Sequence, residues 1–253
     1  MSEHTESSAS LRLFAALPLP RELRDALAGW SRDKLRKTFP MEKWVHPEDY
    51  HLTLKFLGGT PADRMPAVRE ALALVAAGTA PFGLALDGLG TFGRPGLPAV
   101  LWAGVRAAER SGTGAWSGLA DRRRQAAASG GGPDANGRAQ PSGSAQPSGS
   151  AQPSGSAPPS APAPLARLAE AVEAALVPLG YPAEPRAYRP HVTLARRWSA
   201  PHAPDRALLA APPPAALSAP WAADRLVLYR SRLGQAPMYE PLAEFLFGNR
   251  DSG

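Results

Sequence analysis

Two short stretches share the same alternation of polar and apolar residues. His51-Leu-Thr-Leu-Lys-Phe-Leu-Gly58 and His191-Val-Thr-Leu-Ala-Arg196 both read His, apolar, Thr, apolar, which is an HxT motif followed by a further apolar position. Because side chains alternate between the two faces of a strand, each stretch predicts a strand with its His and Thr on one face and apolar residues on the other. Two such strands indicate one cleft with a histidine on either wall.

Other apolar patterns predict the elements around these two strands. Strand-like runs occupy residues 11–17, 82–87, 99–105 and 226–229, and a last strand near Tyr239 completes a terminal hairpin. Apolar residues at helical spacing predict helices over 21–37, from an N-cap at Thr60 to Gly78, and over 165–179. The glycine-rich stretch 88–98 is interpreted as a connection between two strands.

The composition changes abruptly between these regions. Residues 129–164 contain no aromatic residue and no aliphatic residue larger than Ala, and 140–157 hold three tandem copies of Gln-Pro-Ser-Gly-Ser-Ala. Such a segment cannot bury enough apolar surface to offset the entropy lost on ordering. We therefore expect a disordered N-terminus over 1–10, one bilobal domain formed by 11–105 together with 165–248, and a largely disordered insertion over 106–164.

The arginine run Arg122–Arg124 lies in that insertion. It is either a solvated charge run or an auxiliary patch that contacts phosphate. Outside the insertion, each half of the chain has strands, helix patterns and one HxT strand. This order predicts an α+β duplication with a cleft at the junction of its halves.

Composition narrows the class of protein. The chain has no cysteine, which excludes disulfides, thiolate metal clusters and a cysteine nucleophile. Its first residues lack a signal-peptide pattern, and no segment has the length that spans a bilayer. We expect a soluble cytoplasmic protein without a membrane partner.

The net charge of +6 favours an anionic partner such as nucleic acid. It is equally compatible with a solvated basic surface on an arginine-rich chain.

Two histidines facing one cleft suit acid and base catalysis. Near neutral pH one imidazole can accept a proton while another donates one, and both steps are needed when water attacks a phosphodiester. Thr53 and Thr193, with nearby Arg or Lys, could bind the non-bridging phosphate oxygens. Zinc is the competing use of two histidines, but no third ligand stands at HExxH spacing. A serine hydrolase is disfavoured because the chain has no G-x-S-x-G elbow.

At these residues the chain resembles a known family, the two-histidine phosphoesterases, and within it the bacterial RNA 2′,3′-cyclic phosphodiesterases once called 2′-5′ RNA ligases (LigT or ThpR type). Both HxT motifs carry the resemblance, and it covers most of the chain outside the insertion. The other matching stretches are 11–17, 44–51, 88–93, 100–104, 165–180, 188–190 and 226–246.

The resemblance implies a two-lobed, pseudo-symmetric α+β fold in which antiparallel sheets carry helices on the outside and one HxT motif per lobe lines a central cleft. His51 would donate a proton to the leaving 3′ oxygen, and His191 would activate water. Thr53 and Thr193 would bind phosphate. The substrate would be RNA with a 2′,3′-cyclic phosphate end, or a small cyclic nucleotide, and the product a 2′-phosphomonoester. No cofactor or metal is implied, and a monomer is expected.

Three further residues match the family without a clear role. Strict alternation places Phe56 on the back face, in the core, and also takes Arg196 off the His face. A phosphate contact by Arg196 or by Lys55 is a further hypothesis. Two alternatives to hydrolysis stay open, namely a non-catalytic RNA-binding module and 2′-5′ ligation as the reverse reaction.

Overall fold

The computed structural model describes residues 10–94, 97–108 and 162–248. Most of the expected insertion, including the Arg122–Arg124 run, lies outside the described residues, as do residues 1–9 of the expected disordered N-terminus. At the borders of that insertion the strand before it continues to Ala108, and the helix after it begins at Ala163.

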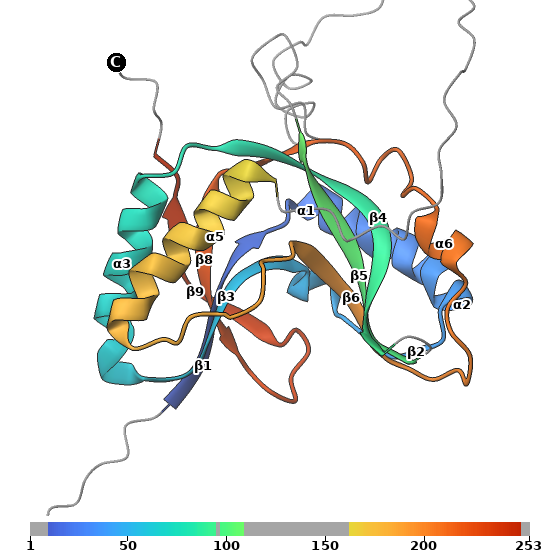
Figure 1. Ribbon diagram of the computed structural model, residues 1–253, viewed down its shortest axis with the longest axis horizontal. Coiled ribbons are helices and arrows are strands. Elements are labelled where there is room, and N and C mark those ends of the chain that lie inside the picture. Colours follow the sequence, from blue (N-terminus) through green and yellow to red (C-terminus); the bar gives the residue numbers. More distant parts are fainter. Residues whose placement is uncertain (1–9, 95–96, 109–161, 249–253) are drawn as a thin grey trace, which may run out of the picture.

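One antiparallel sheet organises the described residues (Figure 1). Its order is β7-β4-β5-β6-β3-β1-β8-β9, with β2 paired to β6 beside this path. The strands are β1 (Ser10–Pro18), β2 (Met41–Trp44), β3 (His51–Pro61), β4 (Phe82–Arg94), β5 (Leu97–Ala108), β6 (His191–Trp198), β7 (Trp221–Ala223), β8 (Arg225–Ser231) and β9 (Tyr239–Leu246). The two expected lobes are therefore two halves of one sheet, joined where β3 meets β6.

Each half of the sheet draws its strands from both ends of the chain. The β3 half contains β1, β8 and β9, and the β6 half contains β2, β4, β5 and β7. The N-terminal β1 pairs with the late strand β8, while the early strand β2 pairs with β6. The duplication predicted from the order of elements is thus interleaved in space.

The helices are α1 (Arg21–Trp30), α2 (Arg36–Thr38), α3 (Met65–Ala77), α5 (Ala163–Leu176) and α6 (Arg206–Ala210). A π turn (Ser31–Leu35) joins α1 to α2, and 3-10 turns cover Pro47–Asp49, Ala62–Arg64 and Val177–Leu179. In Figure 1, α3 and α5 lie side by side over the β3 half, and both contact its strands. Helix α5 precedes the second histidine strand in sequence but packs on the first. None of the helices in the described ranges is both long and apolar enough to cross a membrane.

The apolar positions of both HxT strands are buried, as the alternation predicts. Leu52, Leu54, Val192 and Leu194 belong to one core, together with residues from α3 and α5. Burying such side chains stabilises the fold by about 1.5–3 kcal/mol each. The core therefore fixes the backs of both motif strands, while the His and Thr side chains on the other face stay partly exposed.

The expected N-cap at Thr60 is wrong. Strand β3 continues through this residue to Pro61, and Thr60 is fully buried. Its hydroxyl accepts a hydrogen bond from Tyr181 at 3.3 Å instead of capping a helix. The helical segment begins after Pro61, with the 3-10 turn that leads into α3.

The glycine-rich stretch 88–98 is also not a simple connection. Most of it belongs to β4, which pairs with β5. The indole of Trp102 lies on Gly90, where an added Cβ would stand 2.2 Å from the ring. Glycine is needed there because the indole occupies the space of a side chain.

Candidate active site

Strand β3 contains a β-bulge directly after its HxT motif. Its register with β1 pairs Ala16 with Thr53 and then Ala15 with Lys55, so Leu54 is the extra residue. An extra residue shifts every later side chain to the opposite face. Lys55 therefore points to the back of the sheet, and Phe56 returns to the His face.

Strand β6 contains the matching bulge. Its register with β5 pairs Trp102 with Thr193 and then Leu101 with Ala195, which makes Leu194 the extra residue. Arg196 thereby returns to the face of its motif histidine. Both HxT strands therefore carry a β-bulge at the same position, directly after the motif threonine.

These bulges correct three sequence-based expectations. Phe56 is not in the core: it is 68% exposed, and its ring lies 5.8 Å from that of Phe14, which itself contacts His51. Lys55 does not face a phosphate, because its Nζ is buried and donates to Glu173 Oε1 and to a backbone carbonyl, both at 2.7 Å. Arg196 is not off the His face, because the bulge in β6 returns it there, and its charge lowers the pKa of both motif histidines.

The backbone fixes which nitrogen of His51 carries a proton. Nδ1 lies 2.7 Å from the carbonyl oxygen of Asp49, and a carbonyl can only accept, so Nδ1 donates. Nε2 lies 2.9 Å from the hydroxyl of Thr53. In the neutral ring this hydroxyl donates to Nε2, and in the charged ring the direction reverses. Nε2 is thus the nitrogen that can exchange a proton.

His191 is held in the same way. Its Nδ1 donates to the carbonyl of Arg189 at 2.7 Å, again two residues before the histidine. Phe92 packs edge-on against the ring at a centroid distance of 4.8 Å, and Trp102 lies 6.2 Å away. Both motifs therefore present Nε2 from a ring that is oriented by main chain and aromatic contacts.

The two motifs meet where β3 and β6 pair. Leu52 stands opposite Val192 in this antiparallel contact, so the flanking His and Thr residues of both motifs lie on the other face of the same short ladder. His191 contributes to the lowered pKa of His51, which agrees with this proximity. The sequence-predicted site residues are thus brought together.

The surroundings lower the pKa of both histidines. Burial is the main cause for His51, with smaller contributions from the charges of His191 and Arg196, and its pKa falls from 6.5 to about 4 despite the opposing hydrogen bond to Asp49. Burial and Arg196 also lower the pKa of His191. At neutral pH both imidazoles of the free protein are therefore neutral.

Aromatic residues form a wall around His51. Phe14 lies 4.8 Å from the imidazole, and Tyr239 meets it edge-on at 5.0 Å. Tyr229 stacks on Phe14 at 5.2 Å, and burial raises the pKa of its hydroxyl to about 12. The positive charge of Arg196 lowers the pKa of the Tyr239 hydroxyl, against the larger opposing effect of burial, so the second motif lies near this wall.

Tyr188 joins the two motifs directly. Its hydroxyl donates to the carbonyl of Thr53 at 2.9 Å, although Tyr188 stands three residues before His191.

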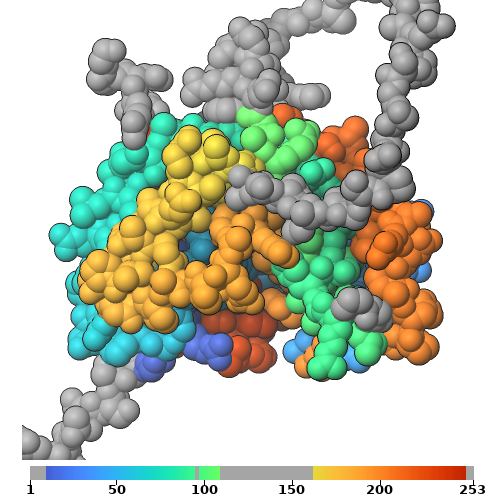
Figure 2. Space-filling view, viewed as in Figure 1, coloured from blue at the N-terminus to red at the C-terminus, as the bar shows by residue number. Residues whose placement is uncertain are grey.

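In Figure 2 the orange segment that leads to β6 crosses the molecule between α5 and the green strands, and the surface is hollowed beside it. A separate cavity of about 590 Å³ is lined by Tyr229 and Tyr239. Space is available next to the His51 wall.

Sequence reasoning did not assign these aromatic residues to the site. Most of them lie in or beside predicted strands or just before a motif, which was the available signal, whereas Phe92 lies in the glycine-rich stretch that was interpreted as a connection. The residues concerned are Phe14, Phe92, Trp102, Tyr188, Tyr229 and Tyr239. Within the described ranges, no cluster of three or more His, Asp or Glu side chains is arranged to hold a metal ion.

Comparison with known proteins identifies the family. The model of the LigT-like phosphoesterases matches residues 17–102 and 156–239. An RNA 2′,3′-cyclic phosphodiesterase of Geobacillus stearothermophilus is 33% identical over 92% of this chain, which spans 56% of that relative. One of Bacillus subtilis is 24% identical and is covered to 94%.

Solved structures share the fold. The Thermus thermophilus protein TT0787 superposes with a TM-score of 0.59 at 24% identity, covering 95% of this chain and 100% of its own. E. coli LigT in its apo form gives a TM-score of 0.56 at 22% identity, with 96% and 100% covered. With the family model matching both motif regions, the chain belongs to the LigT-like phosphoesterase family.

Proposed function

We propose that this protein hydrolyses 2′,3′-cyclic phosphate ends of RNA, or small cyclic nucleotides, to 2′-phosphomonoesters without a metal. The single observation that carries the proposal is the meeting of the two HxT motifs at the Leu52–Val192 strand contact, with each histidine Nδ1 bound to a carbonyl. Two bacterial relatives are named RNA 2′,3′-cyclic phosphodiesterases, which supports hydrolysis of such cyclic ends.

The reaction needs one proton removed and one supplied. His191 Nε2 takes a proton from water as the water oxygen bonds to phosphorus, and His51 Nε2 gives a proton to the 3′ oxygen as its bond to phosphorus breaks. The phosphate stays on the 2′ oxygen, and proton exchange with solvent then returns His191 to its neutral form and His51 to its protonated form for the next turnover. Each step of this kind contributes about 100- to 10,000-fold in rate.

The lowered pKa values of the two histidines fit a site that gains its catalytic proton only when the anionic substrate binds. Both rings are neutral in the free protein, so one must gain a proton when the anionic cyclic phosphate binds. A negative charge beside an imidazole favours its charged form. Thr53, Thr193 and Arg196 hold the non-bridging oxygens in this scheme, and the Arg196 guanidinium stabilises the charge that develops in the transition state.

The test is hydrolysis of a nucleoside 2′,3′-cyclic phosphate and of an RNA carrying such an end, both in EDTA, with identification of the 2′ or 3′ product. We expect a 2′-phosphate from the native protein and loss of turnover in His51→Ala and His191→Ala. His202→Ala, an exposed histidine away from the motifs, is the matched control. Undiminished turnover after both motif substitutions would refute the proposal. RNA binding without any turnover would instead favour the hypothesis of a binding module.

A further inference from the structure

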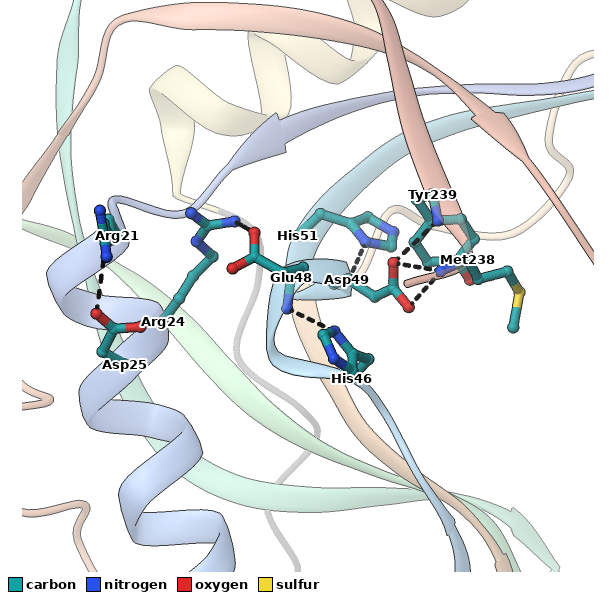
Figure 3. A network of polar contacts seen from close by, with 9 residues as sticks. All are labelled: Arg21, Arg24, Asp25, His46, Glu48, Asp49, His51, Met238 and Tyr239. Atoms are coloured by element: carbon teal, nitrogen blue, oxygen red, sulfur yellow. Dashed lines mark hydrogen bonds and ion pairs between the residues drawn. The ribbon is translucent and has the colours of Figure 1, made fainter. Parts of the chain in front are cut away.

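A buried carboxylate stands immediately before the first motif. Asp49 is 6% exposed, and its side chain reaches the start of β9, far away in sequence (Figure 3). Its Oδ1 accepts from the backbone N–H groups of Met238 and Tyr239, and its Oδ2 also accepts from Met238, all at 2.9 Å. Burial of a charge is costly unless it is hydrogen-bonded, and bonds to an ionised group are the strong ones. This carboxylate therefore ties the β8–β9 hairpin to the turn before His51.

The main chain of the same residue holds the histidine. The Asp49 carbonyl accepts from His51 Nδ1 at 2.7 Å, while its own N–H donates to the carbonyl of His46 at 2.9 Å. The residue is thus fixed inside the 3-10 turn Pro47–Asp49. One residue orients the imidazole by its carbonyl and the hairpin by its side chain.

The hairpin carries a residue that packs against the first motif. Tyr239 meets the His51 ring edge-on at 5.0 Å, and the charge of Arg196 from the second motif acts on its hydroxyl. Movement of the hairpin would therefore displace the aromatic side chain that packs against His51.

The second motif has no carboxylate at the position that Asp49 occupies before the first motif. Arg189 occupies the position equivalent to Asp49, and its carbonyl holds His191 Nδ1 at the same distance of 2.7 Å. Its side chain, however, is exposed. Orienting the ring by a carbonyl does not by itself require an acid at this position.

We infer that Asp49 is a positioning residue for the proposed reaction: its carboxylate holds the backbone of Met238 and Tyr239, so that the Tyr239 ring stays packed against His51 and the acid imidazole keeps its orientation. The inference rests on the proposed function. Misplacement of a reacting group by about 1 Å can cost about 100-fold in rate.

The test compares Asp49→Ala and Asp49→Asn with Glu48→Ala, the neighbouring carboxylate, which is paired with Arg24 outside the His51 contacts. We expect Asp49→Ala to lower kcat about 10- to 100-fold with KM changed less than about threefold. Asp49→Asn should lie between it and the native protein, because one oxygen still accepts while the amide opposes an N–H. Glu48→Ala should stay within about threefold of the native kcat.

A double-mutant cycle tests the route of the effect. If the carboxylate acts through the hairpin, Asp49→Ala should cost little further kcat in a Tyr239→Ala background. Fully additive losses would overturn the inference. So would an Asp49→Ala protein that melts at a lower temperature but keeps the native kcat, since Asp49 would then only anchor the hairpin.

A readout without turnover separates this inference from the proposed function. Nitrogen-15 NMR of the His51 ring should show a single Nδ1–H tautomer in the native protein and in Glu48→Ala. In Asp49→Ala it should show mixed tautomers or a faster-exchanging Nδ1 proton; an unchanged spectrum would contradict the inference. If the native protein has no turnover, the proposed function fails, while these spectra still decide whether Asp49 orients His51.

Discussion

Acidification should destabilise the fold through His51, and the size of the effect follows from its surroundings. The imidazole is enclosed by Phe14 and Tyr239 and lies near the Arg196 charge, which together bring its pKa to about 4, against 6.5 for an ordinary histidine. Because the folded pKa is the lower one, the unfolded chain binds the proton first as the pH falls. The stability is complete above about pH 6.5 and is lost between that value and about pH 4.

The magnitude follows from 1.36 kcal/mol for each pKa unit. The full difference amounts to about 3.4 kcal/mol, and between about pH 7.5 and about pH 5 the His51 contribution is about 2 kcal/mol. Such a loss is a large part of the stability of an ordinary domain.

Urea unfolding at these two pH values, for the native protein and His51→Gln, measures this contribution. His191 destabilises both proteins in the same direction, so the difference between their pH-dependent losses isolates His51. We expect the native protein to lose about 2 kcal/mol more than His51→Gln. Equal losses would refute the picture of a desolvated imidazole at the junction of β3 and β6.

The same electrostatics has a kinetic consequence. Arg196 lowers the pKa of both histidines, so Arg196→Gln should raise both in an NMR titration. A bound phosphate anion acts in the same direction as that substitution. The alkaline limb of kcat should therefore lie at a higher pH than that of kcat/KM, since the two profiles report the complex and the free enzyme. Coincident limbs would contradict this reasoning.

Three further predictions follow from the two bulges. Arg196→Ala should lower kcat/KM on a cyclic nucleotide by about 100- to 1,000-fold, as expected for loss of one transition-state donor, whereas Arg197→Ala, the next arginine along β6, should change it less than about threefold. Phe56→Ala should cost less than about 1 kcal/mol in urea unfolding, against about 2–5 kcal/mol for Leu54→Ala in the core; the reverse order would mean that Phe56 is buried. Lys55→Ala should lower the free energy of unfolding by about 3–5 kcal/mol, because it leaves the Glu173 carboxylate on α5 without a counter-charge. The kcat of the folded protein should stay within about threefold of native. A loss of kcat without a loss of stability would place Lys55 at the phosphate.

Local patterns of apolar and polar residues were sufficient to predict most of the helices and strands. The helix over 21–37 appears as α1, the π turn and α2, and the terminal hairpin appears as β8 and β9. The boundary errors at Thr60 and at the glycine-rich stretch have one cause. Strand β3 runs on because Thr60 is buried beneath Tyr181, and β4 runs on because Trp102 covers Gly90. Both partners are distant in sequence.

The sequence by itself predicted the two histidines and two threonines of the candidate site, because each HxT motif is local and its alternation with buried apolar residues needs only a strand. Only the tertiary structure decided what joins them. The face on which Phe56, Lys55 and Arg196 lie depends on a bulge, and a bulge is set by register with a neighbouring strand. Tyr239 likewise reaches the site because β9 pairs with β8 next to β1. Such pairings depend on contacts between distant segments, which no alternation within one segment specifies.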